Sequence, residues 1–309
     1  MSPSIEHRPG DEHNAADDET LATRGVFGSW GSGVLLVFTG SCFYLYQSSV
    51  WILWSRGSAL GAWGLALAPV VGVLAPVTLA IRTRRVAVRE QLWLYGFSAP
   101  QLFGVLLTAI GAVPVCYGAA ALNAMLTAPD PTYLEAFESL APTGAASALA
   151  GFLAVVVCVP LGEEVLFRFL LFGLLARHVH AVGAVVATSV LFAAAHLAPF
   201  LILPIGLLGI VLGLLTMWSR TLTAAWIGHA VFNSVGYLEL CIGGDAESSP
   251  VQQFVLQPSV LVGGTMLLVA GLSMLRSNAR AAARLEANAA ALWHDAQTHD
   301  RQHDANDDV

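Results

Sequence analysis

Two adjacent acidic residues and an arginine stand inside a long apolar stretch, in the order Glu163, Glu164 and Arg168. An ionisable side chain costs roughly 2.5–3.5 kcal/mol at the centre of a membrane helix, so residues of this kind indicate function. On a helix, Arg168 lies one turn from Glu164 and just beyond one turn from Glu163. The arginine can hold one acid ionised and oriented, which leaves the other free to act as a general base. Taken alone, the three residues are also compatible with a structural ion-pair cluster.

A histidine follows in the next apolar segment, in the run from Phe192 to His196. The turn between the two segments is expected near residues 178–181, at a similar distance along the chain from Glu163 and from His196. An antiparallel hairpin of this kind places the carboxylate and the imidazole at the same depth. A lone membrane histidine is more often a packing residue, but this one is level with a glutamate pair.

A third polar pair, His229 and Asn233, lies in a later apolar segment. The spacing of four puts the imidazole and the carboxamide on one helix face. Such a pair can donate to a common oxygen, as in an oxyanion site, or provide a metal ligand and its hydrogen-bond partner. An interhelical polar contact without chemistry is the alternative.

Together these groups are the parts needed for peptide hydrolysis by an activated water: a base, an orienting arginine, and His and Asn donors. No HExxH motif occurs in the sequence, and Gly243-Gly244-Asp245 lacks the first glycine of a GxGD motif. Ser32 has a glycine on each side but no visible histidine partner. The sequence therefore disfavours zincin-like, aspartyl and rhomboid-type proteases.

The composition indicates a membrane protein. Of 309 residues, 56% are hydrophobic and 11% are charged, and the mean hydropathy is +0.68. A soluble domain carries about 25% charged residues. The charges gather in residues 1–24, in 82–90 and after Arg276. The net charge of −7 comes mainly from the two tails, and nothing in it suggests nucleic acid as a partner. We expect a multi-pass integral protein of a prokaryotic plasma membrane, with the lipid bilayer as its surroundings.

The predicted fold is an all-α polytopic bundle of about eight spans, since a spanning helix needs about 20 apolar residues. The expected spans are residues 30–53, 59–81, 101–126, 145–176, 182–198, 203–218, 222–242 and 258–275. Pro160 and Gly162 lie inside the long segment 145–176, so it is predicted to be one bent helix or two half-helices, which would give nine spans.

Three regions are expected along the chain. Residues 1–28 are a disordered polar tail, residues 29–275 form the transmembrane domain with a catalytic core at about 145–242, and residues 276–309 form a surface helix and a disordered acidic tail. Arginines in short loops mark the cytoplasmic side. With eight spans, the loop 82–90 and both termini are cytoplasmic, and the acidic segment 128–144 lies outside.

The three motifs in series resemble the CPBP family of intramembrane endopeptidases, also called the CAAX prenyl protease or Abi family. The family pattern is EExxxR, then FxxxH, then HxxxN/D, on successive membrane helices. The resemblance covers roughly residues 145–242. One departure is Phe169, which stands directly after the arginine where the family often has glycine.

The resemblance implies a role for each motif residue. Glu163 would be the water-activating base, organised by Glu164 and Arg168. His196 would assist the base or bind a metal, and His229 with Asn233 would stabilise the oxyanion. Two mechanisms are attached to this family. One is metal-independent and of the glutamate type, and the other would hold a zinc ion on Glu163, His196 and His229. The implied substrate is a membrane-embedded or lipid-anchored peptide, including CaaX-like tails.

Two other functions stay open at this stage. Intramembrane Glu, His and Arg clusters also form proton relays in transporters, in which broken helices are common. Inverted repeats would support a transporter, and none is evident. A non-catalytic bacteriocin-immunity protein that binds a partner in the bilayer is the second alternative, and it would not depend on the acids.

Overall fold

The apolar segments predicted from the sequence are helices in the computed structural model, which describes residues 29–55, 61–83, 94, 96–138, 141–242 and 249–307. These ranges contain no strand, so the all-α prediction is confirmed. Residues 1–28 and the predicted tail there lie outside the described residues. Five helical segments are long and apolar enough to cross a membrane: Trp63–Thr83, Ala99–Leu126, Ala145–Leu175, Pro199–Ser219 and Pro258–Leu285.

Each predicted span has a helical counterpart. The first three are α2 (Ser29–Ser55), the run α3 (Gly61–Pro69), η1 (Val70–Leu74) and α4 (Ala75–Thr83), and α6 (Ala99–Leu126). The fourth is the run α8 (Ala145–Gly151), η2 (Phe152–Cys158), α9 (Val159–Glu164), η3 (Val165–Leu171) and α10 (Phe172–Leu175). The rest are α11 (Ala181–Ala195), α12 (Ile202–Ser219), α13 (Leu222–Ile242) and α15 (Pro258–Asp307), with the short helices α7 (Pro131–Glu138), η4 (Pro199–Leu201) and α14 (Pro250–Val255) between them.

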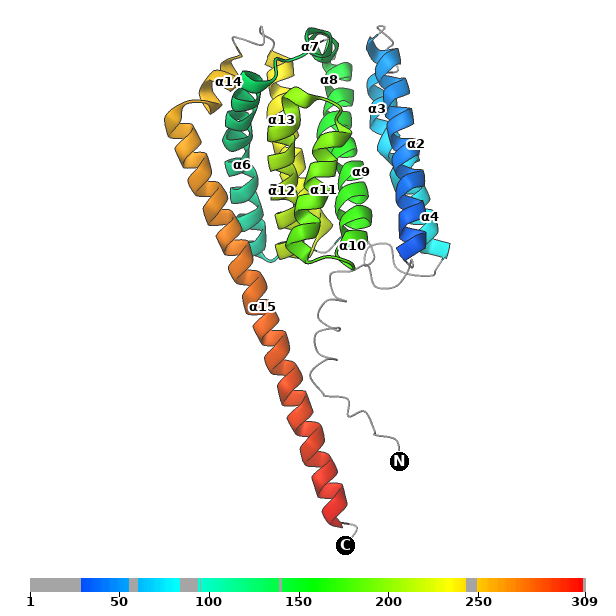
Figure 1. Ribbon diagram of the computed structural model, residues 1–309, viewed down its shortest axis with the longest axis vertical. Helices are drawn as coiled ribbons and strands as arrows, with labels where there is room; N and C mark the ends of the chain where they lie inside the picture. The colour runs from blue at the N-terminus through cyan, green and yellow to red at the C-terminus, as the bar shows by residue number, and fades with distance from the viewer. Residues whose placement is uncertain are drawn as a thin grey trace, which may run out of the picture.

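The long segment with Pro160 and Gly162 is one continuous span, Ala145–Leu175, so the structure resolves the choice between one helix and two. Successive helices alternate in direction, and the first residue of α2 and the outer part of α15 lie at the same end of the bundle (Figure 1). Five of the eight predicted spans meet the length and hydropathy requirements for a crossing, and the total of eight stays a prediction.

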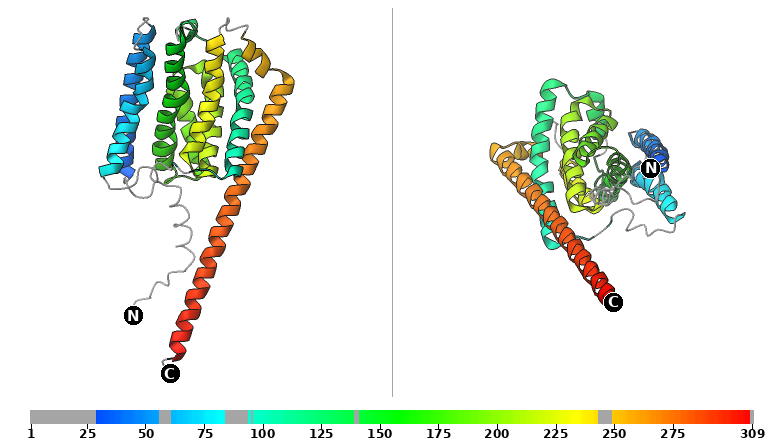
Figure 2. Two further views of the ribbon diagram at one scale, coloured as in Figure 1. Left: turned by 180° about the vertical axis from the view of Figure 1, so that it is seen from behind. Right: turned by 60° about the horizontal axis from the view of Figure 1, so that its bottom comes forward.

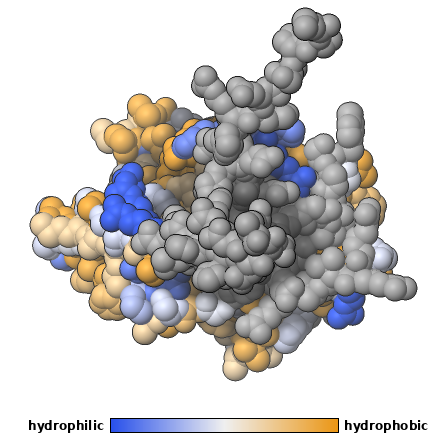
Figure 3. All heavy atoms as spheres, turned by 90° about the horizontal axis from the view of Figure 1, so that it is seen from below, coloured by the Kyte–Doolittle hydropathy of each residue, from blue (hydrophilic) through white to orange (hydrophobic). Residues whose placement is uncertain are grey.

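The described arginines of the short connections lie at this same end. Arg82 is in the last turn of α4, Arg177 follows α10, and Arg220 caps α12 with a left-handed backbone (φ 55°). Arg84, Arg85 and Arg89 lie outside the described residues. Figure 3 views the molecule from this end and shows hydrophobic residues around its rim. The cytoplasmic assignment of this end remains a prediction from the arginines.

Across the bundle, the helices form two edges with the central helices between them (Figure 2). The hairpin of α2 to α4 lies along one edge and packs on the Ala145–Leu175 segment, while α6 and α15 form the opposite edge. Small residues let α6 and α15 approach closely, as is common between membrane helices. A Cβ atom on Gly111 would lie 2.4 Å from the backbone nitrogen of Leu268, and one on Gly271 would lie 2.6 Å from the backbone nitrogen of Thr108.

The helix α15 continues far beyond the bundle, to Asp307 (Figure 1). The sequence predicts a helix over residues 276–293 followed by a disordered tail, so the helix in the structure also includes most of that tail segment. Ala-rich sequence with good helix formers extends without a Pro or Gly from Leu272 to Asp307, which allows one uninterrupted helix.

Two stretches of wider, π-type helix, η2 and η3, flank the short α9 that carries the two glutamates. In both, a backbone N–H donates to the carbonyl oxygen five residues earlier instead of four: Val159 N–H donates to Ala154 O, and Phe172 N–H donates to Phe167 O. Such stretches are rare and concentrate at functional sites. The span that holds the predicted acids is thus irregular on either side of them.

Phe169, the departure from the family pattern, is fully buried. It packs in the main hydrophobic cluster together with Phe43 of α2 and Val165 of the same span. The neighbouring helix α2 therefore accommodates the large side chain within the core.

Candidate active site

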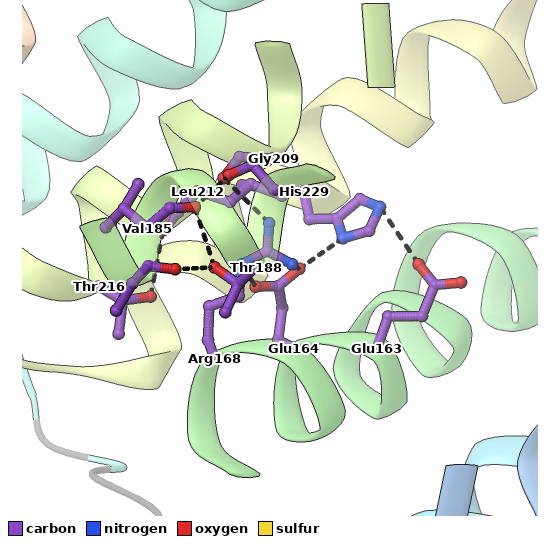
Figure 4. Close-up of polar contacts among 11 residues, drawn as sticks. Glu163, Glu164, Arg168, Val185, Thr188, Gly209, Leu212, Thr216 and His229 are labelled. Carbon is purple, nitrogen blue, oxygen red and sulfur yellow. Dashed lines mark hydrogen bonds and ion pairs between the residues drawn. The ribbon is translucent and has the colours of Figure 1, made fainter. Parts of the chain in front are cut away.

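The centre of the site is Glu164, which is completely buried and held by two partners from different directions. Arg168 Nη1 donates to Glu164 Oε1 at 3.3 Å, and Arg168 Nε lies 3.3 Å from Oε2. The His229 Nδ1–H donates to the same Oε1 at 2.8 Å (Figure 4). The spacing of four residues predicts the arginine contact, and the contact with α13 comes from helix packing.

Arg168 is held in turn by groups on two other helices. Its Nη2 donates to the backbone oxygen of Gly209 on α12 at 3.1 Å. The guanidinium carbon lies 4.6 Å from the centre of the Phe192 ring on α11, at a distance that allows a cation–π contact. A planar guanidinium can satisfy these three directions together, whereas an ammonium group cannot.

Glu163 occupies a different position from its neighbour. Its Oε2 lies 3.8 Å from His229 Nε2, too far for a hydrogen bond. The Glu163 side chain is 7% exposed, whereas that of Glu164 is 0% exposed. Figure 4 shows His229 between the two carboxylates, with one ring nitrogen toward each. Glu164 therefore orients the imidazole, and Glu163 Oε2 makes no hydrogen bond to that ring.

Phe192 is the aromatic centre around which the site residues pack. Its ring makes edge contacts with Phe167 at 5.1 Å, His196 at 4.9 Å and His229 at 5.7 Å between centroids. Together with the Arg168 contact, this ring separates the two histidines and fixes the position of each. The FxxxH motif contains Phe192, but the motif alone does not show that the ring touches both imidazoles.

His196 ends α11, and its Nδ1–H donates to the backbone oxygen of Phe192 at 2.8 Å. That bond leaves Nε2 as the acceptor of the neutral ring. The contact between Phe192 and Arg168 puts these two residues at the same depth in the bundle. Since α11 is antiparallel to the central span, His196 and Glu163 both lie about one turn further toward the same end. The depths of His196 and Glu163 therefore agree with the hairpin prediction. The described contacts join His196 to the cluster through Phe192.

Asn233 donates from Nδ2 to the backbone oxygen of Val155 on η2 at 2.9 Å. In the register set by Val159 and Ala154, the donor for Val155 O would be residue 160, which is Pro160 and has no N–H. Asn233 therefore replaces a missing backbone donor. Trp226, on the same helix, similarly donates to Val157 O at 2.9 Å.

Gly162 allows α3 to approach the glutamates closely. A Cβ atom at this position would lie 2.4 Å from Pro69 Cβ, and the Phe43 ring is 3.6 Å away from it. The residue directly before Glu163 is thus a contact point for both N-terminal helices. The sequence indicated Gly162 only as a kink position, because its role depends on α3.

The residues proposed for zinc do not converge on one point. Among the described residues, no group of three His, Cys, Asp or Glu side chains is placed to hold a metal ion. His229 uses one nitrogen on Glu164, and His196 uses one on a backbone oxygen. As arranged, Glu163, His196 and His229 therefore do not fit the ligand set of a zinc ion.

An apolar groove elsewhere on the molecule is unconnected with this chemistry. It is formed only by α15 residues, and none of them is ionisable: Leu261, Val262, Thr265, Met266, Val269 and Ala270. The site is therefore the cluster that combines the central span with α11, α12 and α13. It brings together Glu163, Glu164, Arg168 and His229, with His196 across Phe192 and Asn233 bonded to the central span.

A helical membrane bundle with buried acids, an arginine and histidines at its centre is the class of protein that the fold and this cluster define. A family model described as "Type II CAAX prenyl endopeptidase Rce1-like" matches residues 145–235, less than a third of the chain. The matched part contains all three motifs, so the resemblance to the CPBP endopeptidases is confirmed there. No curated protein and no solved structure shows a significant match.

The family match and the apolar helices have two consequences. The chain is an integral membrane protein, because five of its helices meet the requirements for a span and the matched family acts within membranes. The match also supports, in general terms, an intramembrane endopeptidase of the CAAX type.

Proposed function

We propose that this protein hydrolyses a peptide bond of a membrane-associated substrate with a water molecule activated by Glu163. The observation that carries the proposal is the unequal environment of the two acids. Glu164 is bound by Arg168 and His229, whereas Glu163 lacks a hydrogen bond at the oxygen nearest His229 and is the more accessible of the two. A general base needs an oxygen that water can reach.

The proposed step conserves atoms and protons. Glu163 takes one proton from water as the water oxygen forms a bond with the carbonyl carbon of the scissile amide. The C–N bond then breaks, and that proton is transferred to the departing nitrogen. The products are a new carboxyl terminus, which retains the second water proton, and an amine. Arg168 and Glu164 keep His229 beside this reaction centre.

The substrate class follows from the surroundings of the site. Glu163 lies within the span Ala145–Leu175, which is surrounded by apolar helices. A scissile bond has to reach this depth, and a hydrophobic segment or a covalent lipid makes entry into the hydrocarbon region favourable. We therefore propose a lipid-anchored or membrane-embedded peptide, with prenylated CaaX-like tails as the first class to test.

The test compares purified wild type with Glu163→Gln in detergent and in liposomes, with a prenylated peptide reporter and a matched unprenylated peptide. We expect the wild type to cleave the prenylated peptide and Glu163→Gln to lose at least a hundredfold in rate, at an unchanged unfolding temperature. Equal rates for the two proteins would refute the role of Glu163. Proton or solute flux that is lost in Glu163→Gln, without cleavage, would favour a transporter instead.

A further inference from the structure

A tyrosine hydroxyl from the first described helix is buried without a hydrogen-bond partner. Tyr44 lies on α2, and within the described residues its oxygen has no partner at hydrogen-bond distance. An unpaired buried polar group costs about 1–3 kcal/mol, so it calls for an explanation. Its surroundings provide one.

Tyr44 lies on the side of α2 that meets the catalytic span. The helix α2 packs on η3, and Tyr44 packs against the hydrophobic cluster that contains Val165 and Phe169. Its neighbour Phe43 reaches Gly162, directly before Glu163. The Tyr44 hydroxyl is also within electrostatic range of both Glu163 and Arg168. The hydroxyl thus approaches the cluster from the edge opposite α11 and α12.

Peptide hydrolysis requires a donor for the oxyanion that forms on the scissile carbonyl. Most other donors of the site are engaged elsewhere. Asn233 donates to Val155 O, His229 Nδ1 to Glu164, and Arg168 to Glu164 and Gly209 O. A phenol can donate one hydrogen bond. Arg168 Nε also lacks a hydrogen bond, but it is ion-paired with Glu164 Oε2 at 3.3 Å, whereas the Tyr44 hydroxyl has neither kind of partner among the described residues.

We propose that Tyr44 is a catalytic residue whose hydroxyl donates a hydrogen bond to the oxyanion that forms on the carbonyl oxygen of the scissile bond. This rests on the proposed hydrolytic function. The oxyanion then supplies the partner that the buried hydroxyl lacks. It also gives α2, which lies outside the segment matched to the endopeptidase family, a direct part in the chemistry.

The test uses Tyr44→Phe, which removes one oxygen and keeps the ring in the core. The matched control is Tyr46→Phe on the same helix, whose ring packs against the same cluster and the adjoining one. We expect Tyr44→Phe to lower kcat for the prenylated reporter by roughly 10²–10³-fold, with KM unchanged. Tyr46→Phe should keep the wild-type kcat and unfolding temperature. Tyr44→Phe should unfold at the wild-type temperature or above it, because it removes an unpaired buried hydroxyl.

A binding measurement separates a catalytic role from a packing role. A peptide phosphinate mimics the tetrahedral oxyanion, so Tyr44→Phe should bind it at least tenfold more weakly than wild type. On the Glu163→Gln background, the uncleaved substrate peptide should bind with equal affinity with and without Tyr44→Phe. Wild-type kcat in Tyr44→Phe, or equal losses of phosphinate and substrate affinity, would overturn the role of Tyr44.

The same assay distinguishes this failure from a failure of the proposed function. If wild type cleaves the reporter and Glu163→Gln does not, but Tyr44→Phe is fully active, then hydrolysis by Glu163 stands and the Tyr44 role falls. If Glu163→Gln and wild type are indistinguishable, the hydrolytic function falls and the Tyr44 role falls with it.

Discussion

Arg168 connects three of the helical segments that build the site. It bonds to Glu164 on its own span, to a backbone oxygen on α12 and to the Phe192 ring on α11. It is 1% exposed, so each of these contacts operates at low dielectric, where removing one partner of a buried pair is costly. The guanidinium therefore sets the position of Glu164, and through it that of His229.

Replacing Arg168 by lysine should show this directly. The ammonium keeps the charge but cannot bond to Glu164 and Gly209 O while lying flat on Phe192. We expect Arg168→Lys to lower kcat at least tenfold and to lower the unfolding temperature, measured with the prenylated reporter and by thermal denaturation. The control is Arg280→Lys on the exposed face of α15, which should change neither. Wild-type activity in Arg168→Lys would show that charge alone suffices.

The sequence predicted the contacts within one helix better than those between helices. The spacing of four gives the bond between Glu164 and Arg168, and the hairpin gives the depth of His196. The acceptor of Asn233 was not predictable, because Val155 O lacks a donor only as a result of the wider helical register next to Pro160. Tyr44 gave no signal either, since a tyrosine in an apolar helix resembles any other aromatic packing residue.

At the scale of elements, the wide turns of the central span determine how α13 docks on it. The register change in η2 and the missing N–H of Pro160 leave Val155 O without a helical donor, and Asn233 of α13 supplies one in its place. Trp226 of the same helix also donates to the central span, at Val157 O. These bonds fix the height of α13, and thereby the height of His229, relative to the glutamates. Pro160 is thus a docking position rather than a break.

The docking role of Pro160 predicts an energetic coupling between this residue and Asn233. Asn233→Ala should destabilise the protein by about 1 kcal/mol, because it leaves Val155 O buried and unpaired. Pro160→Ala restores a backbone N–H, so the double variant should lose less than the sum of the two single losses. The measurement is chemical unfolding in detergent, with the reporter assay in parallel. If the two losses of stability add exactly, and only the variants that lack Asn233 lose activity, the carboxamide would instead act as a donor to the oxyanion.

At the scale of the whole molecule, the alternating helix directions and the unbroken span Ala145–Leu175 are those expected for eight crossings. Hydropathy predicted the helices and their order, since it depends on local composition. It could not predict the partners, such as α2 on η3 or α6 on α15. Those pairings depend on single positions, including Gly162 and Gly111, where a methyl group would collide with the neighbouring helix.

Thiol labelling tests the topology. In a background with the native cysteines replaced by alanine, Thr83→Cys and Arg284→Cys should react with an impermeant maleimide from one side of oriented vesicles. Glu135→Cys on α7 should react from the other side, because an odd number of crossings separates it from both. A break at Pro160 would give nine crossings and place Arg284→Cys on the same side as Glu135→Cys. Retained reporter cleavage confirms that each variant is folded.

The position of His229 between two carboxylates also links the two acids mechanically. Its ring is held at Nδ1 by Glu164 at 2.8 Å, while Nε2 faces Glu163 at 3.8 Å. A substitution that shifts Glu164 therefore moves the imidazole relative to Glu163 as well. The fully buried acid thus controls the surroundings of its neighbour without taking part in the reaction itself.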